Sequence, residues 1–252
     1  MREAEGVRGE CQLGQACDMS SDFQKRIAVL EKHYGRPDPP AVTDPFEMIL
    51  LENAAYLVSD ERRLIAFERL KSDIGTSPTD ILTASDEALY QAAKLGGMLP
   101  EGRIEKLRRS ARIALHELRG ELNASLALPL PKAKRALMKF PGIGEPSAER
   151  ILLFNRSYRV LGLDSNGLRV LLRLGYGSEN KNYSAAYRSA TQAVTPELKD
   201  DYDWLIRAHQ LLRRHGQTMC KTSAPRCPEC PVARQCEYVS LQRNQILASA
   251  LK

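Results

Sequence analysis

Residues 132–154 read KAKRALMKF-PGIG-EPSAERILLF, and they determine the fold more strongly than any other stretch of the chain. Apolar residues recur at helical spacing on both sides of residues 141–144, whose two glycines let the backbone turn sharply. Pro146 suits the first turn of the second helix, where its missing N–H costs little. The stretch therefore predicts two helices joined by a tight hairpin. A plain hairpin turn without a ligand is the alternative that the motif leaves open.

The same hairpin has the chemistry of a phosphate-binding site. The N–H groups of Gly142 and Gly144, together with the N-terminus of the second helix, are able to face a phosphate, and Ile143 is expected to turn inward and pin the turn. The preceding helix adds four basic residues, with no acid between residues 132 and 140: Lys132, Lys134, Arg135 and Lys139. We expect Lys139, Gly142, Ile143 and Gly144 to form a contact surface for phosphate groups.

Four of the six cysteines lie together, with the spacing C-x6-C-x2-C-x5-C. They are Cys220, Cys227, Cys230 and Cys236. Structural zinc sites usually supply two close pairs, and only one close pair is present in this motif. Short, unequal spacings within one loop favour a [4Fe-4S] cubane, whose four irons each take one thiolate. A zinc site and unliganded thiols are the alternatives.

The rest of the chain predicts an all-α fold. From residue 22 onward apolar residues recur at helical spacing, so we expect many helices of about three to four turns. Residues 1–21 are rich in Gly, Glu, Gln and Ser and predict a flexible tail, in which Cys11 and Cys17 are bystander thiols. The expected helical faces are Phe23, Ile27, Leu30 and Tyr34; Phe46, Ile49, Leu50, Ala54 and Leu57; Ile104, Leu107, Ala111, Ala114 and Leu118; and Trp204, Leu205, Ala208, Leu211 and Leu212.

The composition narrows the function classes. With 43% hydrophobic and 27% charged residues, the chain is an ordinary globular protein rather than a disordered or collagen-like one. No stretch approaches the roughly 18 apolar residues of a membrane helix, and the N-terminus lacks the apolar segment of a secretory signal. The net charge of +6, from 37 Lys and Arg against 31 Asp and Glu, fits a polyanionic partner.

Three motifs occur in an order that resembles the endonuclease III branch of the helix-hairpin-helix (HhH-GPD) DNA glycosylases. They are FPGIG at 140–144, LGLDSNGLRV at 161–170, and RHGQTM at 214–219 directly before the cysteines. The resemblance covers about residues 44–240. It implies an all-α bilobal fold: a six-helix lobe at 44–158 that ends in the hairpin, and a second helical lobe of residues 22–43 plus 159–252 that carries the [4Fe-4S] cluster. It also implies that DNA lies across the cleft with the target nucleotide flipped into it.

Asp164 matches the catalytic aspartate of that family. A carboxylate at this position stabilises the cationic sugar of an oxocarbenium-like transition state, or orients water at the anomeric carbon. Leu163 and Leu168 frame it with apolar side chains that would raise its pKa, although we expect it to be mostly ionised at neutral pH. A helix N-cap at Asp164 is the structural alternative, and both roles are compatible.

One departure from the family pattern concerns the reaction. Bifunctional members carry a lysine two residues after the second hairpin glycine, where it forms a Schiff base with the sugar. That position is Pro146 here, which has no side-chain nucleophile. We therefore predict a monofunctional glycosylase. The alternatives are a non-catalytic protein that binds damage or abasic sites, and a bifunctional glycosylase/AP lyase that uses a displaced lysine.

Other departures concern the base pocket. Relatives place a strand-wedging motif where this chain has Glu52, Asn53 and Tyr56. We expect Asn53 to fill the hole left by the flipped base, Tyr56 to stack on that base, and Glu52 to read a base N–H donor. A plain helix face with Tyr56 in the core is the alternative. Met98 and Leu99 match the loop that supplies an apolar wedge, and Asn166 replaces a histidine that is common in the aspartate motif.

Together these observations predict a monomeric base excision repair enzyme. Its substrate is double-stranded DNA that contains a damaged or mismatched base, whose glycosidic bond it hydrolyses. We expect no membrane partner, and we expect a place in the cytoplasm of a prokaryote, at the nucleoid. The sequence does not choose among a mismatched thymine or uracil and an alkylated base.

Overall fold

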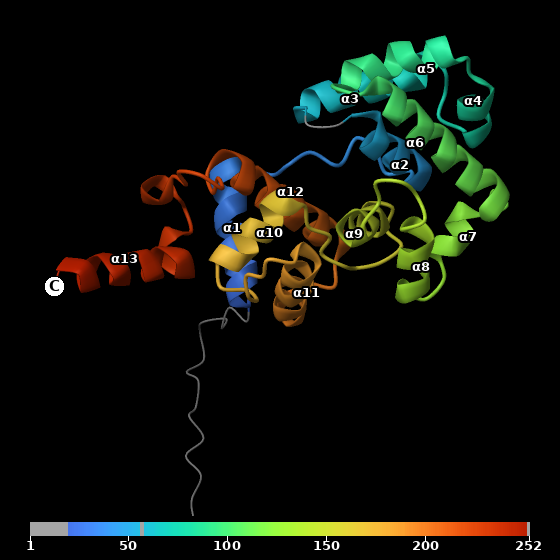
Figure 1. Ribbon diagram of the computed structural model, residues 1–252. Coiled ribbons are helices and arrows are strands. Elements are labelled where there is room, and N and C mark those ends of the chain that lie inside the picture. The colour runs from blue at the N-terminus through green and yellow to red at the C-terminus, as the bar shows by residue number, and fades with distance from the viewer. Residues whose placement is uncertain (1–19, 56–57, 251–252) are drawn as a thin grey trace, which may run out of the picture.

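The computed structural model describes residues 20–55 and 58–250, with side chains through residue 245, and every regular element in that part of the chain is helical (Figure 1). The prediction of an all-α fold is confirmed. The longer α-helices are α1 (Asp22–Tyr34), α2 (Pro45–Ala54), α3 (Asp60–Asp73), α5 (Asp86–Ala93), α6 (Pro100–Arg112), α8 (Leu130–Leu137), α9 (Glu145–Phe154), α10 (Ser165–Arg173), α11 (Tyr183–Val194), α12 (Tyr202–Thr218) and α13 (Glu237–Ala250). Short α-helices are α4 (Pro78–Thr83) and α7 (Leu122–Leu126), and a π-helical segment, Ile113–Glu117, continues α6.

Polar residues at the helix starts explain where many of these helices begin. A side-chain oxygen one residue before the helix accepts a backbone N–H that has no partner within the first turn. Such caps precede α1, α2, α3, α4, α5, α10, α11 and α12, and they are Ser21, Asp44, Ser59, Ser77, Ser85, Asp164, Asn182 and Asp201. Because Ser21 caps α1, the last residue of the predicted tail is part of the helical structure.

One hydrophobic core joins α1 to the C-terminal helices. Phe23, at the start of α1, is fully buried and packs edge-to-face on Tyr176 and Trp204, with ring centroids 5.5 and 5.9 Å apart. The predicted faces of α1 and α12 both point into this core, which also contains buried residues of α10 and α11. In Figure 1 the blue helix α1 accordingly lies beside α10 and α12, far in sequence but adjacent in space.

A second core is built by α2 through α9. The predicted faces that begin at Phe46 and at Ile104 supply it, together with Ile143 of the hairpin. Six of these helices have eight residues or more, and the short helices α4 and α7 connect them. Helix α9 contributes to both cores, since Leu152 packs in this one and Leu153 in the other. The boundaries proposed for the two lobes follow the same grouping of helices and remain a prediction.

Several expectations fall outside the described residues. Cys11, Cys17, most of the predicted tail, Tyr56 and Leu57 belong to this group. Within the described residues, no helix has both the length and the apolar character needed to cross a membrane.

Candidate active site

The hairpin turn is held by a side chain from another helix. Gly142 has φ +76°, a left-handed conformation that favours glycine, and an added Cβ would lie 3.0 Å from Oδ1 of Asn53. The Asn53 side-chain amide donates to the carbonyl oxygens of Ile49 and Pro141, each at 2.9 Å. Asn53 is only 3% exposed. The prediction that Asn53 fills the gap in DNA is therefore wrong: its side chain faces inward and ties α2 to the turn.

Gly144 differs from Gly142. Its φ of −93° and ψ of −178° are extended backbone that any residue adopts, so the turn itself does not require glycine at this position. An added Cβ would meet only Pro146 Cδ, at 3.8 Å, and would otherwise point into open space. Gly144 thus leaves room for a ligand, whereas Gly142 forms the turn.

Gly144→Val is expected to leave the free energy of unfolding within about 0.5 kcal/mol of the unsubstituted protein. It should weaken DNA binding roughly 10- to 100-fold, because the new methyl groups occupy the space next to the hairpin N–H groups. Thermal unfolding and fluorescence anisotropy with a duplex measure the two effects. Gly142→Val is the matched control and should instead lower stability by about 1 kcal/mol or more. Unchanged DNA affinity of the Gly144→Val protein would remove the hairpin from the DNA surface.

The basic helix α8 offers fewer free charges than the sequence suggested. Lys134 lies between Glu145 and Glu149, with its Nζ 2.5 and 2.7 Å from their carboxylates. Both partners lie on α9, so this lysine fastens α8 to α9. Lys132, Arg135 and Lys139 are exposed, and Lys139 is only loosely paired, 3.6 Å from Glu117. The exposed lysines and arginine, rather than Lys134, remain candidates for phosphate contacts.

Asp164 is both a helix cap and a pocket residue. Its Oδ1 accepts the backbone N–H of Gly167 at 2.8 Å and so caps α10, and its Oδ2 accepts the side-chain amide of Asn166 at 3.0 Å. The carboxylate lines a hollow of about 550 Å³ that Pro146 and Tyr183 also line. The structure thus brings the predicted catalytic aspartate and the proline at the lyase position into one pocket.

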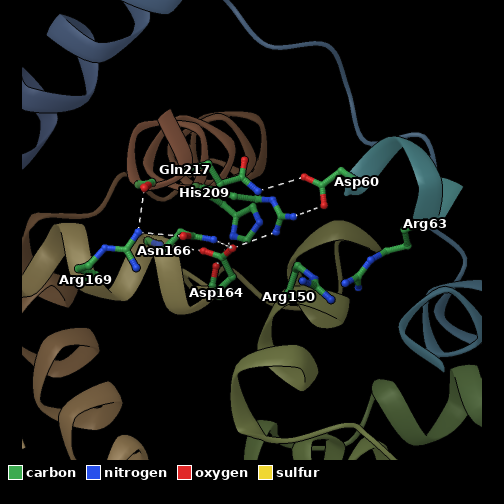
Figure 2. A network of polar contacts seen from close by, with 12 residues as sticks. Asp60, Arg63, Arg150, Asp164, Asn166, Arg169, His209 and Gln217 are labelled. Atoms are coloured by element: carbon green, nitrogen blue, oxygen red, sulfur yellow. Dashed lines mark hydrogen bonds and ion pairs between the residues drawn. The ribbon is translucent and has the colours of Figure 1, made fainter. Parts of the chain in front are cut away.

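An arginine that the sequence analysis missed is the main partner of Asp164. Arg213 of α12 places Nη1 2.9 Å from Asp164 Oδ2, and its Nη2 pairs with Asp60 at the start of α3. Gln217, one turn further along α12, also donates to Asp60, at 3.1 Å. Figure 2 shows this chain of contacts running from Asp164 to Asp60. Arg213 is separated from Asp60 by 153 residues in sequence, so no local pattern indicates the pair.

Close packing of α12 on α10 creates this arrangement. An added Cβ at Gly216 would lie 2.6 Å from the carbonyl oxygen of Asn166, so only glycine permits this approach. His209 lies one turn before Arg213 and is fully buried; burial lowers its pKa to about 4. Its ring N–H donates to the Gly162 carbonyl. In the sequence, the sign of Arg213 as a pocket residue is its spacing. It lies on the same face of α12 as His209 and Gln217, four residues from each.

The surroundings of Asp164 keep its carboxylate ionised. Burial is the largest influence and raises the pKa, but the Arg213 guanidinium, the Gly167 N–H and the Asn166 amide together outweigh it, so that the pKa lies below its usual value. The expectation that Leu163 and Leu168 raise the pKa is wrong in its net direction, because it considered only the apolar neighbours. The expected ionisation at neutral pH agrees with the lowered pKa.

Arg213→Met is expected to raise the pKa of Asp164, because the burial remains after its cationic partner is removed. If ionised Asp164 is required, excision by the variant should decline at a higher pH than excision by the unsubstituted protein as the solution is acidified. Single-turnover rates measured as a function of pH test this. Asp60→Asn is the control, since it removes the other partner of Arg213. It should leave unchanged the pH at which excision declines in acid. If excision by Arg213→Met declined at the same acidic pH as excision by the unsubstituted protein, the role of Arg213 in keeping Asp164 ionised would be contradicted.

The predicted wedge is exposed and rigidly supported. Met98 and Leu99 are 69% and 77% exposed, and Leu99 adopts the left-handed region at φ +58° directly before α6. The guanidinium of buried Arg103 donates to the carbonyl oxygen of Ala93 at 2.9 Å, and to those of Gly97 and Met98. Arg103 thus fixes the loop that presents the two apolar side chains, which keeps them available for a role in DNA.

Glu52 lies in the pocket rather than on a DNA-facing surface. Its Oε1 is 3.2 Å from Arg63 Nη1 and 2.5 Å from Arg150 Nη2, so three helices, α2, α3 and α9, meet at this carboxylate. Glu52, Arg63 and Arg150 line the same hollow as Asp164. The two arginines offset the negative charge of Glu52.

The four clustered cysteines line one largely apolar hollow. No three Cys, His, Asp or Glu side chains among the described residues converge closely enough to hold a single metal ion. Burial raises the pKa of Cys230 to about 11, so that thiol becomes a ligand only when a cation replaces its proton. Four thiols that line one hollow provide the donor set of a four-cysteine metal site.

Hydrogen bonds connect this cysteine loop to the pocket. Arg169 donates to the Cys220 carbonyl oxygen at 2.8 Å and to the Asn166 side-chain oxygen at 2.9 Å, and Asn166 in turn donates to Asp164. Figure 2 shows Arg169, Asn166 and Asp164 in sequence along α10. On the other side of the loop, His215 Nε2 lies 3.5 Å from Cys230 Sγ. The conformation of the loop therefore bears directly on the position of Asp164.

Comparisons with known proteins relate this chain to endonuclease III in both sequence and fold. No family model matches the sequence. The chain is 27% identical over 195 residues to endonuclease III of Sulfolobus acidocaldarius, which covers 77% of this chain and 82% of that protein. A trapped endonuclease III–DNA covalent intermediate superposes with a TM-score of 0.68 at 19% identity, covering 89% of this chain and all of the other. The chain therefore resembles the endonuclease III-like HhH-GPD DNA glycosylases in sequence and in fold.

Two further comparisons define how far this likeness extends. Endonuclease III of Rickettsia conorii is 31% identical over 111 residues, so the match spans about half of that protein, 49%, and 43% of this chain. The structure of a thermostable thymine-DNA glycosylase has a TM-score of 0.68 at 18% identity, covering 87% of this chain and 97% of that one. The predicted resemblance to endonuclease III-like glycosylases, the fold and the enzyme class, a DNA N-glycosylase, are confirmed. The individual site residues and the base remain predictions.

Proposed function

We propose that this endonuclease III-like protein is a monofunctional base excision repair glycosylase. It binds double-stranded DNA as a monomer, flips a damaged or mismatched base into the pocket at Asp164 and hydrolyses its glycosidic bond. Asp164, held ionised by Arg213, stabilises the positive charge that develops on the sugar as the base departs. We place the reaction at the nucleoid, in the cytoplasm of a prokaryote.

The monofunctional assignment rests on which residues line the pocket. Schiff-base chemistry needs a lysine amine that reaches the sugar. No lysine is present among the described residues that line the hollow at Asp164, and the lyase position is Pro146. Lys139 lies on the far side of the turn, where it is exposed. These facts favour hydrolysis over lyase chemistry, including the alternative of a displaced lysine.

The ionised carboxylate also favours an enzyme over a non-catalytic binder. Burying a carboxylate is unfavourable unless it is paired, and this chain supplies Arg213, Asn166 and the Gly167 N–H to keep it charged inside the pocket. A protein that only bound damaged DNA would gain nothing from a negative charge facing the phosphates.

The cofactor belongs to the same proposal. We infer that Cys220, Cys227, Cys230 and Cys236 hold a [4Fe-4S] cluster. All four thiols line one hollow, and their spacing contains only one close pair, whereas structural zinc sites usually supply two. When bound, the cluster cross-links the loop; a site closed by four cysteines leaves no position open for substrate. Through Arg169 and Asn166, the cross-linked loop then holds Asp164 in place.

Single-turnover assays on duplexes with different damaged or mismatched bases test the proposal, with each reaction read before and after alkali treatment. A monofunctional glycosylase leaves abasic sites, so strand breaks appear only after alkali. Breaks without alkali, together with a borohydride-trapped complex, would indicate a lyase. Retention of the duplex with no breaks under either condition would indicate a binding protein.

A further inference from the structure

Glu52 and its two arginines form a charged edge in the wall of the pocket. The Glu52 side chain is 17% exposed, and its closest contacts to Arg63 and to Arg150 both involve the same oxygen, Oε1. Oε2 is therefore the oxygen left for another partner. Figure 2 shows the guanidinium groups of Arg63 and Arg150 pointing toward one another, to the right of Asp164 in that view.

The hydrogen-bonding character of this edge is fixed by its residue types. An ionised carboxylate only accepts hydrogen bonds, and a guanidinium only donates them. The closest ion pair of each arginine is with Glu52, and each guanidinium has further N–H groups that are able to donate. Glu52 contacts both arginines, so its carboxylate lies between two guanidinium groups. The edge therefore presents donor, acceptor and donor groups from Arg63, Glu52 and Arg150.

A complementary base edge must read acceptor, donor, acceptor. Uracil and thymine present this pattern, because their ring N3–H lies between two carbonyl oxygens. Adenine and cytosine instead present a bare ring nitrogen, which would face the Glu52 carboxylate with two acceptors opposed. An alkylated purine with a methyl group on that edge would leave the carboxylate without a donor, and an unpaired buried charge is costly.

We propose that the pocket selects bases with an intact imide edge, of the uracil and thymine kind, and that Glu52 is the specificity residue that accepts the N3–H. This inference rests on the proposed function, since it assigns the base that the glycosylase removes. Asp164 acts on the sugar, while Glu52, Arg63 and Arg150, which line the same hollow, bind the departing base.

The experiment compares bases that differ at one atom. The cluster-containing, full-length protein is given duplexes with uracil, thymine, N3-methyluracil, adenine or 3-methyladenine, each opposite guanine, and single-turnover release of the free base is measured. We expect release of uracil and thymine. N3-methyluracil should react at least about 100-fold more slowly, because a site built around a hydrogen bond strongly rejects an analogue that lacks it.

Glu52→Gln tests the residue. An amide that replaces the free carboxylate oxygen turns the acceptor into a donor, so uracil release should fall roughly 10- to 100-fold. The ratio of the uracil rate to the N3-methyluracil rate should also fall toward one, and this ratio does not depend on how much of the protein is folded. Glu47→Gln is the matched control on the same helix, because Glu47 pairs with Lys71 and Thr76 outside the pocket. It should change neither value.

The outcomes separate this inference from the proposed function. Equal rates for uracil and N3-methyluracil, or an unchanged ratio in Glu52→Gln, would overturn the inference. Release of adenine or 3-methyladenine without release of uracil or thymine would also overturn it, while leaving the glycosylase assignment intact. Release of no base from any duplex would overturn the proposed function, and the inference with it.

Discussion

Asp164→Asn is expected to slow base excision by two or more orders of magnitude, about the span assigned to one preorganised electrostatic group. Asparagine keeps the shape of the side chain, and its carbonyl oxygen still accepts the Gly167 N–H, so the cap of α10 survives. The negative charge is lost, and an NH2 group replaces the oxygen that accepts from Arg213 and Asn166. DNA affinity should hold or rise, because a carboxylate facing phosphates is removed.

Single-turnover excision and anisotropy with an abasic-site duplex measure these two effects of Asp164→Asn. The melting temperature, followed in parallel, confirms that the fold is kept. If the asparagine protein excised its base at the unsubstituted rate, Asp164 would be a helix cap and no more. The catalytic assignment would then have to move to another residue of the pocket.

Cys227→Ser is expected to have the second largest effect, because it removes one of four ligands from a loop that contains little other regular structure. Metal binding and folding are coupled in such sites, so the loop should lose its fixed conformation and the iron with it. DNA binding and excision should fall together, since Arg169 links the Cys220 carbonyl to Asn166 and Asp164.

Iron and sulfide analysis of the purified protein checks the basis of this prediction. About four irons and matching inorganic sulfide per chain are expected before substitution. Cys11→Ser is the matched control, because that cysteine lies outside the cluster motif and should be dispensable. Stoichiometric zinc without sulfide would contradict the cluster assignment.

Features that depend on local sequence could be predicted well. The hairpin follows from two glycines between amphipathic helices, the faces of α1 and α12 follow from helical spacing, and the capping role of Asp164 follows from its place before the helix. These patterns depend on neighbouring residues along the chain. For the same reason they identified Gly142 and Gly144 as turn residues but did not distinguish them, since only the backbone angles show which one requires glycine.

Features that depend on contacts between distant segments could not be predicted. Arg213 meets Asp60 and Asp164 across the pocket, and a basic residue on a basic helix gives no sign of such partners. Asn53 is of a residue type that often contacts DNA, but its side-chain amide donates to the carbonyl oxygen of Pro141, 88 residues away. Lys134 likewise has the character of a phosphate ligand until α9 places two carboxylates beside it.

The most direct test of the central claim is to identify the products of a single turnover on a duplex with uracil opposite guanine. The free base is detected by chromatography, and the mass of the damaged strand is measured without alkali or heat. The account predicts one equivalent of free base and an intact strand that carries an abasic site. A strand cleaved by elimination, or complete recovery of the uracil-containing strand from this duplex and from duplexes with other damaged bases, would contradict it.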